Sequence, residues 1–187
     1  VVILPYRFWG NMKKFLMVLC GFVMIPLWAQ VQKYSWDFSD CEIRDILYAV
    51  SLDTGFSIVA DDTVKGTGTF KFVGDDFEKA FDSFLATSRL YVSKNDGLWT
   101  VSRCRVEVEN DLISLDVFDL SPSQILDKIS VVVEKPISFD SLPNNHLTMH
   151  FRNLNEIELL EKICMYFSGY QVNESESGYH FSKKNNS

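Results

Sequence analysis

The sequence predicts an α+β fold that consists of two tandem small two-layer modules, each with the element order β-α-β-β-α-β-β. Three observations predict it: an internal repeat, apolar residues that switch between strand and helix spacing within each repeat, and an ordinary globular composition. The chain has 187 residues, of which 47% are hydrophobic and 23% are charged. This length fits one medium domain or two small ones, and the composition supports a packed core rather than a disordered or fibrous chain.

The internal repeat is found by aligning the chain with itself. Holding an offset of 79 residues without a gap from residue 34 to residue 92 gives eleven identities. This is about three times the number expected by chance at ordinary composition. We therefore expect copy one at residues 34–103 and copy two at residues 113–183. The identical pairs are Ser35/Ser114, Asp37/Asp116, Asp40/Asp119, Ile46/Ile125, Leu47/Leu126, Ser51/Ser130, Ile58/Ile137, Asp61/Asp140, Thr69/Thr148, Phe72/Phe151 and Tyr91/Tyr170.

The first 29 residues have the features of a secretory signal peptide. The expected start, Met12, opens a basic segment that ends at Lys14, and an apolar run over residues 15–28 follows. We expect cleavage after Ala29, which makes Gln30 the first residue of the exported protein. A retained membrane anchor is the alternative, but the apolar run is shorter than the roughly 20 residues that span a bilayer.

Charge and cysteine content exclude two further classes of protein. The exported part has 15 basic and 25 acidic residues, a net charge of −10, so a surface that neutralises nucleic-acid phosphates is not expected. A lipoprotein would use Cys20 as its attachment site, but bulky Leu19 precedes it and the apolar stretch before it is very short, so we expect Cys20 to leave with the signal peptide. Cys41, Cys104 and Cys164 remain, and three cysteines do not make a disulfide framework. The fold is therefore expected to depend on packing.

Copy one begins with a strand, because aromatic residues alternate with polar ones from Tyr34 to Phe38. Ser39 and Glu42 have the spacing of a capping box, which predicts a helix that ends at Gly55. The further elements expected in this copy are strand 56–60, turn 61–66, strand 69–73, a helix capped by Asp75 or Asp76, and a hairpin over 91–101 that turns at Asn95-Asp96-Gly97.

Copy two repeats this order. The segment Ser121–Gln124 has the features of a helix start, and a hairpin over residues 170–181 closes the copy. Between the copies, residues 104–112 contain neither Gly nor Pro, so we expect a short linker that is a stiff connection or an added strand. Residues 184–187 are a polar tail, which we expect to be disordered.

No combination of residues matches a catalytic site, so no catalytic residue, cofactor or metal is predicted. His146 and His150 are four residues apart on an expected strand, which is too far for them to share a metal. His180 can approach His150 across the sheet, but two histidines without a third ligand are a weak zinc signal. A periplasmic hydrolase that uses His150 or His180 with nearby acids is a remote alternative.

Other polar and apolar candidates have structural explanations. The doublets Asp61-Asp62 and Asp75-Asp76 fall at a turn and at a helix start, where Asp side chains accept backbone N–H groups. Cys41 and Cys164 align with leucines of the other copy and are expected in the core, whereas Cys104 is either an exposed thiol in the linker or a half-buried inert one. The aromatic residues expected to point inward are Trp36, Phe72, Phe81, Phe84 and Trp99.

Several segments resemble a known family. Asp37–Leu47, Thr54–Val59, Val64–Phe70, Phe77–Leu85 and Leu90-Tyr91 resemble the secretin and TonB N-terminus short domain, or STN domain. Copy two is similar to a diverged member through Ile125-Leu126, Ile137–Asp140, Leu147–Phe151 and Tyr170. In that family such modules form the periplasmic end of secretins, the outer-membrane rings of type II and type III secretion and type IV pilus machines. They are also signalling domains of TonB-dependent receptors.

The resemblance implies docking to another protein rather than catalysis. We expect a non-enzymatic, periplasmic protein-interaction protein of a secretin-type machine, and association with the outer membrane is left open. These partners are envelope secretion or pilus proteins, among them inner-membrane assembly components or a secretin ring; a homo-oligomer is left open. Neither nucleic acid nor a small-molecule substrate is expected. Two modules leave no room for the membrane-embedded channel, so a truncated secretin is a variant of this expectation, and a stand-alone signalling or adaptor domain for a TonB-dependent receptor is the alternative.

The expected docking site is the first strand of copy one, Tyr34, Ser35, Trp36, Asp37 and Phe38. An exposed sheet edge offers unpaired backbone N–H and C=O groups to an incoming strand. This strand closely follows the expected cleavage site, whereas the equivalent strand of copy two is tied to the linker. Because the exported chain is acidic, we expect the partner to present basic residues.

Overall fold

The computed structural model describes residues 33–184. The predicted start at Met12, the signal peptide with Cys20, and the cleavage site at Ala29 and Gln30 lie outside the described residues. So does the predicted tail apart from Lys184. The described chain from Tyr34 onward belongs to one compact unit with four helices and eleven strands, which confirms the α+β class.

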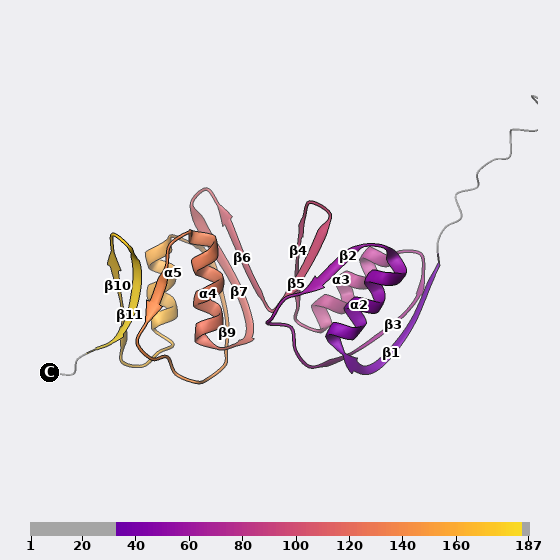
Figure 1. Cartoon of the computed structure of the whole chain (residues 1–187), viewed down its shortest axis with the longest axis horizontal. Helices are drawn as coiled ribbons and strands as arrows, with labels where there is room; N and C mark the ends of the chain where they lie inside the picture. The colour runs from indigo at the N-terminus through magenta and orange to yellow at the C-terminus, as the bar shows by residue number, and fades with distance from the viewer. Residues whose placement is uncertain (1–32, 185–187) are drawn as a thin grey trace, which may run out of the picture. The chain divides into compact units, whose positions relative to one another are not determined.

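The elements follow the predicted order twice (Figure 1). One strand, β6, is added before the second set, and every other element of that set starts within one residue of the position that the 79-residue offset predicts. The first module comprises β1 (Tyr34–Glu42), α2 (Ile43–Thr54), β2 (Ser57–Ala60), β3 (Thr67–Gly74), α3 (Phe77–Thr87), β4 (Tyr91–Asn95) and β5 (Leu98–Ser102). The second comprises β6 (Cys104–Glu109), β7 (Leu112–Leu120), α4 (Pro122–Val133), β8 (Ile137–Phe139), β9 (Leu147–Leu154), α5 (Glu156–Cys164), β10 (Tyr170–Ser175) and β11 (Gly178–Lys183).

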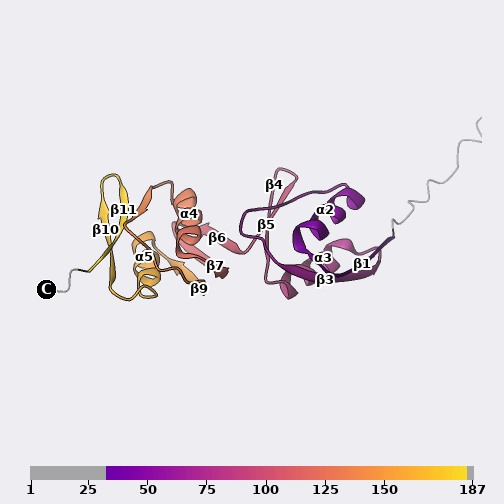
Figure 2. The same cartoon turned by 60° about the horizontal axis from the view of Figure 1, so that its bottom comes forward.

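In each module the helices lie between two small sheets (Figures 1 and 2). Helix α2 contacts β1 and β3 of one sheet and β2 of the other, and α5 contacts β7 and β9 of one sheet and β10 of the other. The expected two layers are therefore corrected to three: sheet, helices and sheet. The physical reason is that one helix pair buries apolar side chains against a sheet on each side.

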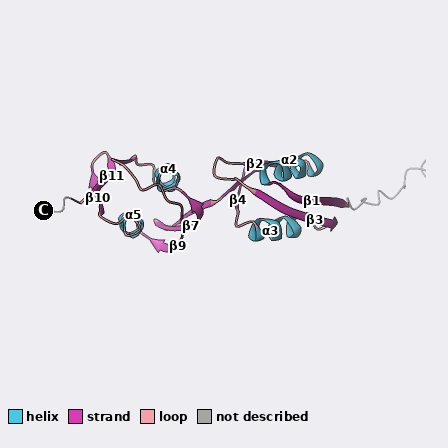
Figure 3. Cartoon of the chain, turned by 90° about the horizontal axis from the view of Figure 1, so that it is seen from below, coloured by secondary structure: helices cyan, strands magenta, loops and turns pink. Residues whose placement is uncertain are grey.

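The two modules differ in the sheet that contains their first long strand. Figure 3 shows this strand with its shared kind of neighbour, β1 beside β3 in the first module and β7 beside β9 in the second. In the first module β1 pairs antiparallel with β3 alone. In the second module the equivalent strand, β7, lies between β6 and β9 and is antiparallel to both. Most of the segment 104–112 is thus an added strand rather than a plain connection. The other sheet has the same pattern in both modules, β2-β5-β4 and β8-β11-β10, with β2 parallel to β5 and β8 parallel to β11.

A β-bulge interrupts the first long strand of both modules and explains two of the repeat identities. The register of β1 on β3 and that of β7 on β9 shift at the bulge. There Asp40 and Asp119 have positive φ angles of 52° and 56°. Their backbone N–H groups donate to Oγ1 of Thr69 at 3.3 Å and of Thr148 at 3.1 Å. Each module therefore holds its bulge with the same Asp and Thr pair.

The predicted capping box at Ser39 and Glu42 is wrong because of this bulge. Strand β1 continues through it to Glu42, and α2 begins at Ile43 without a side-chain cap. The N–H of Ile43 donates to the carbonyl oxygen of Gly66 at 3.0 Å instead. A backbone group of the β2–β3 loop thus satisfies a donor that a side chain was expected to satisfy.

The other helix and turn signals are confirmed. Ser121 and Gln124 form the capping box of α4, and Asp76 caps α3 by accepting the backbone N–H of its third residue at 3.2 Å. Gly55 takes a φ of 77° at the end of α2. Positive φ at Asp96-Gly97 makes the β4–β5 hairpin turn, as a two-residue loop between antiparallel strands requires.

Each module has its own hydrophobic core. Among the aromatic residues predicted to point inward, Trp36, Phe81, Phe84 and Trp99 are buried in the first core, and Phe72 packs against it partly buried. Aliphatic residues make up most of the second core. The repeated Ile-Leu pairs, Ile46-Leu47 and Ile125-Leu126, are buried in both modules, so these identities mark the core face of the first helix.

Residues of the two modules also contact each other. Lys128 of α4 forms ion pairs with Asp61 at 2.8 Å and with Asp62 at 3.2 Å in the β2–β3 loop. The backbone N–H of Phe118 donates to the carbonyl oxygen of Arg103, the single residue between β5 and β6, at 2.9 Å. The connection between the modules is therefore short and hydrogen-bonded.

Candidate functional site

The five residues predicted to bind a partner all lie in β1, at the edge of a two-stranded sheet. Strand β1 pairs with β3 along one edge. Along its second edge it pairs with no other strand between residues 33 and 184. Backbone groups on such an edge are the ones that strand addition uses.

The side chains of these five residues face in two directions. Trp36 is buried and stacks on Tyr34 with the ring centroids 5.0 Å apart. Tyr34 and Phe38 are partly buried at the rim of the same core. Ser35 and Asp37 are exposed on the outer face of the sheet. Trp36 therefore anchors the strand in the core. An incoming strand would meet the backbone of β1, the exposed outer side chains, and the partly exposed rings of Tyr34 and Phe38.

Asp37 carries the negative charge among these five residues. Its Oδ1 forms an ion pair at 2.8 Å with Nζ of Lys71 on β3, and 72% of the Asp37 side chain remains exposed. The hydrogen bond from Lys71 lowers the pKa of Asp37, so this carboxylate is ionised at neutral pH.

The equivalent residue of the second module, Asp116 on β7, has a much richer set of partners. Nη2 of Arg105 on β6 lies 2.7 Å from its Oδ2, and Nη2 of Arg152 on β9 lies 2.6 Å from its Oδ1. Nδ1 of His150, also on β9, is 2.9 Å from Oδ1. The side chain of Asp116 is only 5% exposed. Burial on its own raises the pKa of Asp116, but the hydrogen bonds from these three residues outweigh burial and lower it to about 2.

The sequence does not single out Arg105, Arg152 or Lys71, because each reaches its aspartate from a neighbouring strand. One sequence pattern that begins at Arg105 nevertheless predicts a strand. Charged residues and valine alternate from Arg105 to Glu109, which is the pattern of a strand with one face on a core. This alternation indicates a strand, but it does not give the strand's pairing partner or the contact of Arg105 with Asp116.

Each of the three histidines has a partner on or beside a strand. His150 contacts Asp116, as described above, and Nδ1 of His146 lies 3.1 Å from Oδ1 of Asp119. Nδ1 of His180 lies 2.8 Å from Oγ of Ser138. No three His, Cys, Asp or Glu side chains gather into a possible metal site within residues 33–184. The structure thus brings the histidines to separate places rather than to one centre.

Of the carboxylate doublets, Asp61-Asp62 lies at a turn and Asp75-Asp76 at a helix start. Oδ1 of Asp61 accepts the backbone N–H of Thr63 at 2.9 Å, as predicted for a turn residue. Oδ1 of Asp76 accepts a backbone N–H of α3, as described above. Asp61 and Asp62 have in addition the cationic partner Lys128, which no turn signal predicts.

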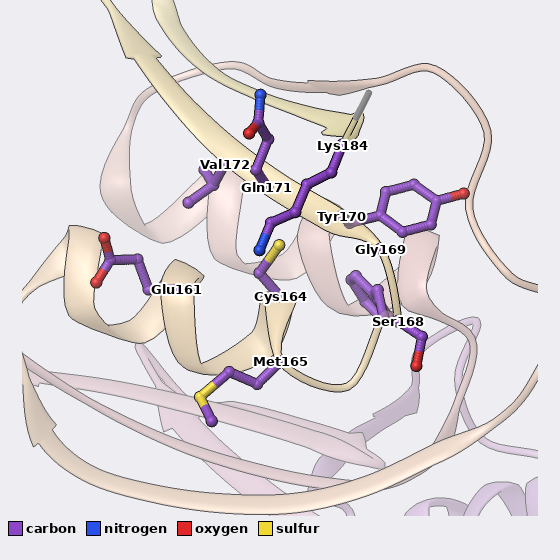
Figure 4. Close-up of a pocket in the computed structure, with 10 residues that line it drawn as sticks. Glu161, Cys164, Met165, Ser168, Gly169, Tyr170, Gln171, Val172 and Lys184 are labelled. Atoms are coloured by element: carbon purple, nitrogen blue, oxygen red, sulfur yellow. The ribbon is translucent and has the colours of Figure 1, made fainter. Parts of the chain in front are cut away.

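Burial affects two of the three described cysteines strongly. Cys104 is buried rather than exposed in the linker, and burial raises its pKa to about 12. Cys164 lines an open pocket between α5 and β10, where the side chain of Lys184 points toward it (Figure 4). Burial nevertheless raises the pKa of the Cys164 thiol. Both thiols are therefore protonated at neutral pH, while Cys41 packs partly buried against the first core as a small apolar residue.

No helix among residues 33–184 is long and apolar enough to cross a membrane. No protein-family model and no curated protein sequence matches the chain. The site is therefore defined by its own geometry: a strand edge in the first module that no strand of residues 33–184 pairs with, and an equivalent edge in the second module that β6 pairs with.

Proposed function

We propose that this chain is a non-enzymatic, exported protein-interaction protein of a secretin-type secretion or pilus machine, and that it docks to another envelope component through β1. The single observation that carries the docking proposal is the strand order. Among the described residues no strand pairs with the second edge of β1, whereas the equivalent edge of β7 holds β6.

Three further features support the proposal. The resemblance of both copies to STN domains links the modules to secretins and to TonB-dependent receptors, where they dock to proteins. The features of a signal peptide in residues 1–29 support export to the periplasm. The excess of acidic over basic residues favours a partner with basic residues at the contact.

Affinity purification tests this proposal. The tagged full chain is expressed in its source cells, cross-linked in intact envelopes, and recovered for mass spectrometry. We expect secretion or pilus components to be enriched over a tagged periplasmic control. Enrichment of a TonB-dependent receptor and its regulator instead would favour the alternative, a signalling or adaptor domain. Recovery of no envelope protein above the control would contradict the proposal.

A further inference from the structure

The second module contains a strand that shows how the edge of β1 can be filled. Strands β1 and β7 occupy equivalent places in the repeat, and each pairs with the equivalent strand, β3 or β9. Strand β6 occupies the second edge of β7 and runs antiparallel to it. The same edge of β1 has no strand partner among the described residues.

The register of β6 on β7 can be transferred to β1 through the 79-residue offset. In the second module Val117 pairs with Cys104, Asp116 with Arg105, and Leu115 with Val106. The equivalents of Val117, Asp116 and Leu115 are Phe38, Asp37 and Trp36. A strand added to β1 in this register would alternate apolar and charged residues, with its first basic residue opposite Asp37.

The burial of apolar residues supports this register. On β7, Ile113 and Val117 are 2% and 0% exposed, and β6 contributes Cys104 to the same core. Their equivalents on β1, Tyr34 and Phe38, are only partly buried. An added strand with apolar residues at alternate positions would cover the exposed parts of the Tyr34 and Phe38 rings. This favours binding because it removes apolar surface from water.

The charged side chains around the two aspartates support this register as well. Asp116 has three basic partners, and one of them, Arg105, comes from the added strand. At Asp37 the partner from β3 is present, since Lys71 is the equivalent of His150. The residue that would correspond to Arg105 can come only from a strand on the open edge. The exposed carboxylate of Asp37 is thus placed to receive a basic side chain from that direction.

We infer that the open edge of β1 binds an antiparallel strand of a partner protein in the register that β6 takes on β7, with a basic residue opposite Asp37 and apolar residues opposite Trp36 and Phe38. This inference rests on the proposed function, because it specifies the partner segment that docks at the same edge. The recognised chemistry is an extended peptide with the order apolar, basic, apolar, acidic, apolar.

A peptide with the sequence of residues 103–110, with alanine in place of the cysteine so that this position stays apolar, is the probe. It carries a fluorophore at its N-terminus, and its anisotropy is measured against the full chain. We expect saturable binding. Asp37→Asn should weaken it about tenfold, because a charge-assisted hydrogen bond at a partly covered site is lost. Glu174→Gln, which removes an exposed charge from the edge strand β10, is the matched control and should leave binding unchanged.

Two variations of the peptide test the register and the mode of binding. Glutamate in place of the peptide residue equivalent to Arg105 should abolish binding to the wild-type chain and restore it to Asp37→Lys. Methylation of alternate backbone amides should block binding for one alternate set and spare the other, because a strand in a ladder presents every second N–H group to a given neighbour. Circular dichroism of each variant checks that the chain remains folded.

The inference is overturned by absence of saturable binding at about 1 mM peptide, by equal binding to wild type and Asp37→Asn, or by equal effects of both methylation sets. It is also overturned if sedimentation shows that the chain dimerises through β1, since a second copy would then occupy the edge.

If envelope partners co-purify equally with wild type and Asp37→Asn, the proposed function stands and the register fails. If the peptide binds as expected but no secretion or pilus component is recovered, the register stands and the proposed function fails.

Discussion

Asp37 and Asp116 show how the same residue in two copies of a module acquires different surroundings. Asp116 is covered by β6 and held by two arginines and a histidine from neighbouring strands. Asp37 has Lys71 on β3, and no strand of the described residues covers its other side. The identity of the two aspartates was visible in the repeat, but their partners were not, because those come from three different strands.

Replacing Asp116 by asparagine should lower the free energy of unfolding by about 2 kcal/mol near neutral pH, since its folded pKa of about 2 lies below the ordinary 3.8. A carboxyl group with a lowered folded pKa stabilises the fold above its ordinary pKa, and this contribution is lost as the pH falls from about 4 to about 2. The difference between wild type and variant should therefore shrink over that range.

Urea unfolding at about pH 7 and about pH 2.5 measures this difference. Asp37→Asn is the matched control and should have little effect on stability at either pH, because its ion pair with Lys71 is exposed to solvent. A stability loss in Asp116→Asn that is equally large at both pH values would show that its carboxylate charge is not what stabilises the module.

At the scale of elements, the helix starts show where the sequence was sufficient and where it was not. Ser121 and Gln124 cap α4 as predicted, because all the interacting groups lie within four residues of each other. Ser39 and Glu42 have the same kind of spacing, but the bulge at Asp40 keeps this segment in β1. Local spacing predicts an element well unless a contact from a distant strand, here through Thr69, favours another conformation.

The positive φ angle at the bulge of β1 leads to a testable prediction. Asp40 has a φ of 52°, a conformation that glycine adopts freely and a β-branched residue does not. The free energy of unfolding of Asp40→Val should therefore be lower than that of Asp40→Gly by about 1 kcal/mol or more. Both variants lose the Asp40 side chain, so the difference between them isolates the backbone conformation. Chemical denaturation measures it, and equal stability of the two variants would mean that the positive φ is not needed.

At the scale of the whole molecule, the element order and the class were predictable because each copy repeats its hydrophobic pattern. The pairing of β6 was not fixed by the sequence, since a stiff connection and an added strand fit residues 104–112 equally well. The layering was also missed. Apolar spacing shows which face of a helix is buried, but it does not tell how many sheets cover that face.

Contacts between the modules predict that the pair is more stable than one module alone. Lys128 reaches Asp61 and Asp62, and the backbone of Phe118 bonds to Arg103. A fragment of residues 34–103 loses these contacts, and a module of about 70 residues has a small core. We expect the fragment to fold with a lower melting temperature than the full chain, as calorimetry would show. Equal melting temperatures would indicate two independent modules.

Both the proposed function and the inferred register require a partner segment beside β1. The most direct test of this requirement places the photo-cross-linker benzoylphenylalanine at Ser35, on the outer face of β1, and irradiates the full chain in its source cells. We predict an adduct with an envelope protein whose cross-linked segment alternates apolar and charged residues, while the same cross-linker at Glu174 on β10 gives none. No adduct at Ser35, or the same adduct in the same yield at both positions, would show that no partner segment lies beside β1.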